Sequence, residues 1–444
     1  MEKYPAYQKY KKTRCAWLQE IPEHWDFKRL KNVVSCNDEA LDERTDPDLE
    51  IEYVDISSVS LVNGIEKTET MPFEKAPSRA RRKVKDGDII VSTVRTYLKA
   101  IAPICEPPEN MVVSTGFAVV RPKNNLFSGF AGYLLQSNGF VGDVVANSVG
   151  VSYPAINASD LVRIPAVEPP LEEQKAIARF LDFKIAQIDS LIAKKKSLLD
   201  KLTEKRTALI SHAVTKGLDQ TVQMKSSGIE WIGNIPRHWS IRRIKFAAKL
   251  ESGHTPSKQV PEYWEDCDIP WVSLNDSKQL SAVDYISETA IQINSLGLAN
   301  SSARLLPANA VVFTRDATIG LSAITTRTMA VSQHLIAWIP GLDITSLYLL
   351  RVFSAMKGFL DSFTFGATIK TIGMPDVKRL AMPIPPREEQ EVITAFIDEQ
   401  LRTISPQIRA IEIAIDKLTE YRSALITGAV TGQIDVRGFE TPQP

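Results

Sequence analysis

The stretch LDKLTEKRTALISHAVTKGLD at residues 199–219 returns, little changed, as IDKLTEYRSALITGAVTGQID at residues 415–435. EPPLEEQKAIARFLD at 168–182 matches IPPREEQEVITAFID at 384–398 in the same way, and both pairs are 216 residues apart. Ordered matches of this quality indicate an internal duplication. A repeat of this kind decides the architecture of a chain before any other signal does.

Each copy opens with a related aromatic and proline segment, WLQEIPEHWDFKRLK at 17–31 and WIGNIPRHWSIRRIK at 231–245. Short alternating strand patterns with turn signals follow, until a proline cluster ends the stretch. The sequence therefore predicts two similar globular domains of mixed strands and helices, each followed by a long helix.

Apolar residues mark one stripe on each predicted helix. From Ile185 in the first copy and from Leu401 in the second, their spacing alternates between three and four residues. This is the pattern of a coiled-coil seam, and the best-matched partner for each stripe is the other copy. Pro406 stands where the first helix has Ser190, so we expect the second helix to bend there.

The predicted fold class is α+β, with two domains of mixed strands and helices separated by two long helices. We expect these helices to pair as an antiparallel coiled coil, which would give the chain pseudo-two-fold symmetry. The expected division is a first domain at 1–168, a first spacer helix at 169–216, a linker at 217–230, a second domain at 231–384, a second spacer helix at 385–428 and a C-terminal tail at 429–444.

Composition limits the class of protein. With 444 residues, 44% hydrophobic and 24% charged, the chain is expected to form several soluble globular domains. Its 53 basic and 53 acidic residues cancel, so any nucleic-acid binding has to come from local patches. No apolar run is long enough for a bilayer, and the four cysteines lie far apart without a CxxC motif. We therefore expect a cytoplasmic protein without a membrane segment, a zinc site or disulfides.

Motifs for catalysis are missing from the sequence. It contains neither a phosphate-binding GxxxxGK[ST] loop nor an HExxH motif. The Asn-Pro-Pro-aromatic motif of amino-methyltransferases is absent too, because the three Pro-Pro pairs are followed by Glu109, Leu171 and Arg387. His24 and His238, beside tryptophans in the repeated opening, are interpreted as structural residues that pack in a turn. We expect no catalytic residue, no metal and no cofactor on this chain.

Two basic segments without acids are candidates for contacts to DNA phosphates, SRARRKVK at 78–85 and NIPRHWSIRRIKFAAK at 234–249. The competing interpretation of either one is a solvated strand edge or turn. The residues expected to contact phosphate are Arg79, Arg81, Arg82, Lys83, Arg242, Arg243 and Lys245.

Candidates for reading bases come from loops. A weaker repeat match pairs DGDIIVST at 86–93 with PANAVVFT at 307–314, and polar segments follow both strands. Arg95 and Arg315 are the first candidates, at the same place in the repeat but one position apart in this alignment. Loops at 148–153 and 365–370 form a second pair, in which glycines and hydroxyl groups are also compatible with plain turns. The remaining candidates from all these loops are Tyr97, Tyr153, Thr318 and Lys370.

These motifs resemble those of the specificity subunits of type I restriction-modification enzymes, over essentially the whole chain. The repeated W-x-x-x-I-P-x-H-W is similar to the start of that family's target recognition domains. The repeated P-P-x-E-E-Q resembles the start of its spacer helices, and L-T-E-x-R-x-A-L-I resembles their end.

The resemblance implies that each domain reads one half of a split, asymmetric site in double-stranded DNA and that the helices set the gap between the halves. It implies a non-catalytic chain that recruits two modification subunits, which bind S-adenosylmethionine and methylate adenine. Restriction subunits that translocate and cut DNA are further expected partners.

Other classes stay open from the sequence. A coiled-coil adaptor that presents two protein-binding domains would suit the neutral net charge. A stand-alone DNA-binding regulator would bind its operator without modification subunits. An enzyme of unrecognised type has no supporting cluster of residues.

Overall fold

The computed structural model describes residues 4–363 and 370–440. Two helices dominate it, α4 at Leu171–Lys216 and α10 at Arg387–Val430. The chain forms two compact units, the first made of residues 1–196 and 413–444 and the second of residues 197–412. Each unit therefore contains one globular part with one stretch of α4 and one stretch of α10.

The first unit contains two four-stranded sheets, ordered β11-β10-β13-β4 and β8-β5-β12-β9. The bounds of its strands and short helices are β1 Tyr10–Lys12, β2 Glu20–Pro22, β3 Asp26–Arg29, β4 Val34–Cys36, β5 Glu50–Val54, β6 Val59–Ser60, β7 Gly64–Ile65, β8 Glu69–Pro72, β9 Ala80–Lys83, β10 Ile89–Ser92, β11 Ile101–Pro103, β12 Met111–Ser114, β13 Phe117–Pro122, α1 Ser128–Gln136, α2 Asn138–Ala146, α3 Ala158–Leu161 and β14 Pro165–Glu168.

The second unit contains a five-stranded sheet ordered β18-β25-β22-β23-β20 and a three-stranded sheet ordered β21-β19-β24. The bounds of its elements are β15 Met224–Ser226, β16 Asn234–Pro236, β17 Ser240–Arg243, α5 Ile244–Ala247, β18 Ala248–Ser252, β19 Ile269–Val272, α6 Ser277–Leu280, β20 Tyr285–Ile286, β21 Gln292–Ile293, α7 Ser295–Ala299, β22 Val311–Thr314, β23 Ser322–Thr325, β24 Ala330–Val331, β25 Leu335–Pro340, α8 Ser346–Asp361, α9 Met374–Val377 and β26 Ala381–Ile384.

The central strands of each unit are apolar on both faces because each sheet lies between two cores. On β10, Ile89 and Val91 enter the core that the sheet shares with the long helices, while Ile90 enters the core between the two sheets. On β22, Val311 and Val312 alternate in the same way. Successive side chains of a strand point to opposite faces, so a strand that is buried on both sides needs a continuous apolar run.

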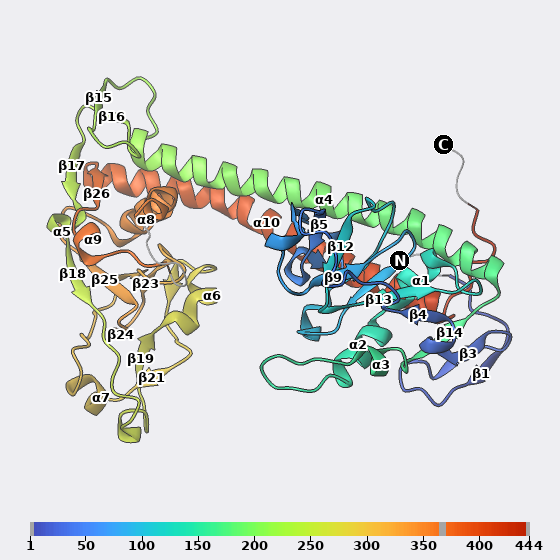
Figure 1. Ribbon diagram of the computed structural model, residues 1–444. Helices are drawn as coiled ribbons and strands as arrows, with labels where there is room; N and C mark the ends of the chain where they lie inside the picture. Colours follow the sequence, from blue (N-terminus) through green and yellow to red (C-terminus); the bar gives the residue numbers. More distant parts are fainter. Residues whose placement is uncertain (1–3, 364–369, 441–444) are drawn as a thin grey trace. The chain divides into compact units, whose positions relative to one another are not determined.

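The two long helices lie side by side within each unit (Figure 1). In the first unit, Ile188 of α4 shares a core with Leu425, near the end of α10. In the second, Ile210, near the end of α4, shares a core with Ile393, near the start of α10. The beginning of one helix thus packs on the end of the other, and the predicted antiparallel pairing and α+β class are confirmed.

The proline in the second helix does not interrupt it. Pro406 lies within α10 and its side chain is exposed. Proline has no N–H to donate to the carbonyl one turn earlier. On the solvent side of a helix that carbonyl can bond to water instead, so the proline is tolerated. The expected bend at this residue stays a prediction.

A repeated glutamate joins each domain opening to its helix. The Glu173 side chain accepts hydrogen bonds from Trp25 Nε1 (3.0 Å) and from the Tyr7 hydroxyl, and it pairs with His24 Nε2 at 2.8 Å. In the second unit, Glu389 accepts from Trp239 Nε1 and pairs with His238 Nε2, both at 2.9 Å. Both histidines thus contact the first turn of a long helix in addition to lying beside tryptophan.

The end of the chain belongs to the first unit. After α10, Asp435 donates its backbone N–H to the Pro5 carbonyl, and Phe439 packs edge-on against Phe180 of α4. In the second unit, the segment that follows α4 instead continues into β15, which pairs with β16. Within the described ranges 4–363 and 370–440, no helix is both long and apolar enough to span a membrane.

Candidate nucleic-acid interface

Hydrogen-bond register shows which loop residues of the two units are equivalent. Ser92 pairs with Phe117 at the end of β10, and Thr314 pairs with Leu335 at the end of β22. One residue further on, Thr93 N–H donates to Gly116 O at 2.8 Å, and Arg315 N–H donates to His334 O at 3.0 Å. Thr93 and Gly116 of the first unit therefore correspond to Arg315 and His334 of the second.

This register corrects the expected relation between the two candidate arginines. The equivalent of Arg95 is Ala317, and both residues have a left-handed backbone, with φ of 50° and 62°. Arg95 and Arg315 are thus two positions apart, not one. The sequence match misplaced them because two short apolar strands align almost equally well when one is shifted by a residue. Only the hydrogen bonds between strands set the register.

The candidates of the first unit meet at one loop cluster. The guanidinium carbon of Arg95 lies 5.0 Å from the ring centre of Tyr153, a cation–π contact. Thr96 Oγ1 and Ser148 Oγ are 2.8 Å apart, which joins the loop after β10 to the loop after α2. Tyr153 is 66% exposed and Tyr97 is 52% exposed. Two aromatic rings and an arginine thus face solvent from a braced loop.

The candidates of the second unit have a different arrangement. Arg315 lies beside Asp316, with Nε 3.6 Å from Oδ1, and Asp316 Oδ2 is 2.7 Å from His334 Nδ1. Thr318 is exposed, and the carbonyl of the exposed Lys370 accepts the N–H of Ala317 at 2.8 Å. The rest of the predicted loop at 365–370, including Gly366, lies outside the described residues.

The basic segment at 78–85 is partly neutralised within the first unit. Arg79 Nη2 lies 2.7 Å from Asp55 Oδ2, and its Nε donates to the Tyr53 hydroxyl at 3.2 Å. Burial alone would raise the pKa of Asp55, but hydrogen bonds from Ser57 and Tyr53 and the charge of Arg79 hold that pKa below its usual value. Arg79 therefore already has an anionic partner before any phosphate arrives.

The neighbouring basic residues on β9 differ from one another. Arg81 lies 4.5 Å over the Phe73 ring, and Arg82 is half-buried with its Nε unpaired among the described residues. Lys83 is exposed. The segment is thus built into the domain surface, with Arg79 and Lys83 as its exposed predicted cations.

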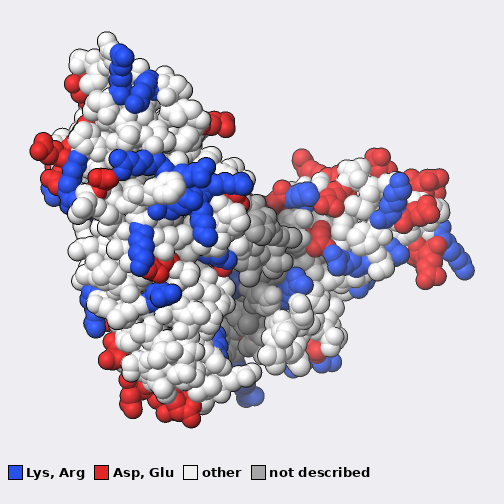
Figure 2. All heavy atoms as spheres, turned by 90° about the vertical axis from the view of Figure 1, so that its left-hand side faces the viewer, with Lys and Arg blue, Asp and Glu red and all other residues white. Residues whose placement is uncertain are grey.

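The basic segment at 234–249 lies on β17 and α5. Arg243 is exposed, Arg242 pairs with Asp343 at 2.5 Å, and Lys245 Nζ lies 5.0 Å from the Phe246 ring centre. Figure 2 shows a cluster of lysine and arginine side chains on the face of the second unit that is turned toward the viewer.

Sequence reasoning missed the counterparts of this patch. Exposed Arg29 and Lys31 of the first unit stand where the second has Arg243 and Lys245, because β3 pairs with β14 as β17 pairs with β26. The signal was present in the repeated openings DFKRLK and SIRRIK, which share these basic positions.

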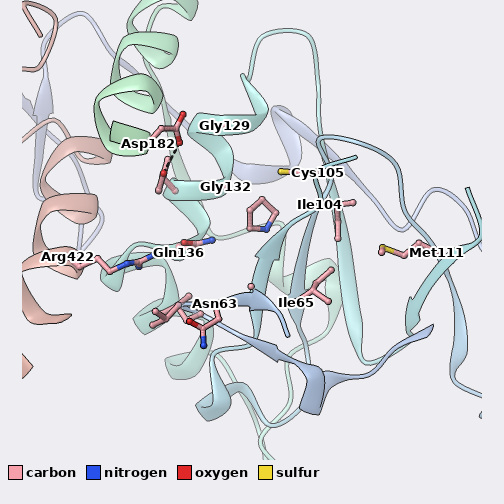
Figure 3. A pocket seen from close by; sticks show the side chains of 15 residues that line it. Asn63, Ile65, Ile104, Cys105, Met111, Gly129, Gly132, Gln136, Asp182 and Arg422 are labelled. Atoms are coloured by element: carbon pink, nitrogen blue, oxygen red, sulfur yellow. Dashed lines mark hydrogen bonds between the residues drawn. The ribbon is translucent and has the colours of Figure 1, made fainter. Parts of the chain in front are cut away.

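A separate hollow of about 560 Å³ lies in the first unit (Figure 3). Gly129, Gly132, Cys105 and Arg422 are among its lining residues. Asp182 at its wall accepts the hydroxyl of Tyr133 at 2.8 Å. Burial, together with that bond, raises the pKa of Tyr133 far above its ordinary value. None of the predicted DNA-binding residues lines this hollow.

Comparison with known proteins decides the family. A sequence model described as the type I restriction modification DNA specificity domain matches twice, at residues 22–201 and 236–412. The chain belongs to the type I restriction-modification DNA specificity family. The family predicted from the repeated motifs is thereby confirmed, and the protein-binding adaptor is not favoured.

Relatives and solved structures of this family match over much of the chain. A putative type I restriction enzyme specificity subunit of Methanocaldococcus jannaschii, MjaX, is 23% identical over 445 residues, covering 96% of this chain and 97% of its own. A second subunit of that organism, MjaIX, is 30% identical over 168 residues, 37% of this chain and 38% of the relative.

One solved chain, from work on complex assembly and conformational transition of the type I R-M system, has a TM-score of 0.68. It is 22% identical, and the match covers 92% of this chain and 98% of that chain. The likeness supports the fold of two recognition domains with two long helices.

Proposed function

We propose that this chain is the subunit that reads a split, asymmetric sequence in double-stranded DNA, one half-site per domain, and directs methylation and restriction by partner subunits. The observation that carries the proposal is the contrast between framework and loops. The register of the paired central strands and the tryptophan and histidine contacts of the glutamate are the same in both units, while the side chains at equivalent loop positions differ. A shared scaffold with different reading groups suits two different half-sites.

The roles within each domain follow from exposure and partners. The exposed loop residues Arg95, Tyr97 and Tyr153 of the first unit are proposed to reach the bases of one half-site. Arg315, Thr318 and Lys370 are proposed to do so in the second unit. Phosphate contacts are assigned to Lys83 and Arg243 before the others. Arg79, Arg81, Arg82, Arg242 and Lys245 contribute less, because each already has an intramolecular partner or is half-buried.

The chain itself is proposed to be non-catalytic and cytoplasmic. Two modification subunits would supply S-adenosylmethionine and adenine methylation, and restriction subunits would supply cleavage. In the described parts of the chain, no group of three or more His, Cys, Asp or Glu side chains is arranged to hold a metal ion. The support for non-catalytic action is the family membership together with the structural use of His24 and His238.

The test is methylome sequencing of cells that carry this chain with its modification subunits. The expected result is one new adenine-methylated motif made of two defined halves and an undefined gap. Cells that lack only this chain serve as the control and should lose the motif. If all subunits are expressed and no split motif appears, the proposed function is wrong.

A further inference from the structure

One place in the repeated framework carries charge in the second unit and none in the first. Arg315, Asp316 and His334 of the second unit correspond to Thr93, Val94 and Gly116 of the first. The two sets have the same backbone hydrogen bonds, so their side chains occupy the same site of the domain. Since the framework does not require charge there, the charge of the second unit needs another explanation.

In the first unit this site is closed by apolar groups. A side chain at Gly116 would place its Cβ 2.4 Å from Ile56 Cδ1 and 3.1 Å from Val94 Cγ2, so these two residues fill the space that His334 uses in the second unit. Thr93 turns its hydroxyl inward and donates it to Gly116 O at 2.9 Å. The first unit thus presents no free polar group from this site.

In the second unit the same site is a polar chain of three residues. His334 Nδ1 lies 2.7 Å from Asp316 Oδ2, within hydrogen-bonding distance. The other oxygen, Asp316 Oδ1, is buried without a hydrogen bond to any described residue, and so is Arg315 Nε, 3.6 Å away. Asp316 is 7% exposed, whereas the side chain of Arg315 is 24% exposed.

Among the described residues, Arg315 has donors without a hydrogen-bond acceptor. The inner edge of its guanidinium faces Asp316, and no hydrogen bond from its outer nitrogens to any other described residue is formed. Asp316 Oδ2 has His334 as its partner, but Asp316 Oδ1 and the Nε of the mostly buried Arg315 face each other at 3.6 Å without a hydrogen bond to any described residue. Burying these two atoms without a hydrogen bond costs free energy, and an arginine with unused donors suits an external acceptor.

We propose that Arg315, positioned by Asp316 and His334, reads a guanine in the half-site of the second domain, and that the first domain has no such readout at the equivalent site. This inference rests on the proposed function. A guanidinium donates two parallel hydrogen bonds to O6 and N7 of guanine in the major groove, the commonest specific contact of arginine with a base. Arg315 contacts the base, and Asp316 and His334 are positioning residues.

The first experiment compares methylomes of cells that carry the full complex with the wild-type chain, Arg315→Ala or Arg315→Lys. Both variants should lose the requirement for one G·C pair in the second half-site, and methylation at the original site should fall roughly 10- to 100-fold. The first half-site should stay unchanged. The matched control is Arg327→Ala, an exposed arginine of the same unit paired with Glu288, which should leave both halves unchanged.

A second measurement begins with the wild-type complex, so its main result does not depend on the folding of a variant. The wild-type complex should bind a duplex with 7-deazaguanine at that position more weakly, by about 10-fold, because the N7 acceptor is gone. The Arg315→Ala complex should not distinguish the two duplexes. Asp316→Asn, with Arg315 intact, should reduce the discrimination without abolishing binding.

The outcomes separate the two hypotheses. If the wild-type complex produces no split motif, the proposed function itself fails. If it produces one, but the Arg315 variants keep the motif unaltered, or relax a base of the first half, or relax an A·T pair, the guanine readout alone is overturned. Equal binding of the wild-type complex to the guanine and 7-deazaguanine duplexes overturns it too.

Discussion

At the scale of single residues, the repeated opening motif and the repeated helix start explain each other. Glu173 is 7% exposed and receives three side chains from the opening segment, and Glu389 receives two in the second unit. Both carboxylates lie in the first turn of a helix, where the helix dipole favours negative charge. Each domain opening is thereby tied to the helix that follows more than 140 residues later.

Glu173→Ala is expected to lower the free energy of unfolding by about 2–4 kcal/mol. Three hydrogen bonds to a charged, buried acceptor are lost, and Trp25 Nε1 is left without its partner. The matched control is Glu172→Ala, whose side chain is 83% exposed and should change stability by less than about 0.5 kcal/mol. Urea unfolding of the full chain, followed by tryptophan fluorescence, measures both. Equal effects of the two substitutions would contradict the role given to Glu173.

At the scale of elements, two equivalent domain helices, α1 in the first unit and α8 in the second, contact a long helix by different chemistry. In the first, Tyr133 of α1 donates to Asp182 of α4. In the second, Arg351 of α8 stands at the equivalent place and donates to Asp398 of α10 at 2.6 Å. Phe127 N–H and Thr345 N–H, which donate to the glutamines that follow the two glutamates, define this equivalence. At this place the first unit has a hydrogen bond from a tyrosine hydroxyl to an aspartate, and the second has an arginine–aspartate ion pair.

Arg351→Ala is expected to destabilise the second unit by about 3 kcal/mol. Arg351 is 2% exposed and also pairs with Asp284, so its removal leaves two carboxylates without their cation. Arg402→Ala is the control. That exposed arginine pairs with Glu399 one turn away on α10, and its removal should cost less than about 1 kcal/mol. Thermal unfolding of the full chain compares them. If Arg351→Ala unfolds at the temperature of the wild-type chain, the ionic contact carries no stability.

At the scale of the whole molecule, the core of each domain includes residues of both long helices, α4 and α10. The first domain shares its core with Leu425 and Val430 of α10, and the second shares its core with Ile210 and Val214 of α4. Both helices carry the repeated sequence, so a foreign domain with the same opening and ending motifs would find the same partners. Specificity is then expected to be exchangeable by domain.

Replacing residues 1–165 with the corresponding domain of another member of the family should change one half of the methylated motif and leave the other half and the gap unchanged. The reason is that the strands and loops of this domain are exchanged, while α4 and α10 keep their lengths. Methylome sequencing of the chimaera with the same modification subunits measures this. A change in both halves would refute the modular interpretation. The wild-type chain, expressed in the same way, is the control.

Much of this fold is predictable from sequence because its signals are local. The apolar stripes of α4 and α10, the prolines before them and the repeated openings each lie within a few turns of chain. The candidate site was harder to predict. Arg95 and Tyr153 came from separate loops in the sequence, and their contact depends on the bridge between Val94 and Ala155. The one-residue error in the register of Arg315 and the missed Arg29 and Lys31 come from the same lack of long-range information.

The sequence by itself therefore determined the duplication, the long paired helices and the family, because periodicity and repetition can be recognised without knowledge of tertiary contacts. Only the tertiary structure decided that Glu173 and Glu389 hold the domain openings, and that Thr93 and Gly116 stand where the second unit has Arg315 and His334. Those relations join residues that are distant in the chain, and hydrogen-bond register, which apolar strands do not reveal, sets which of them meet.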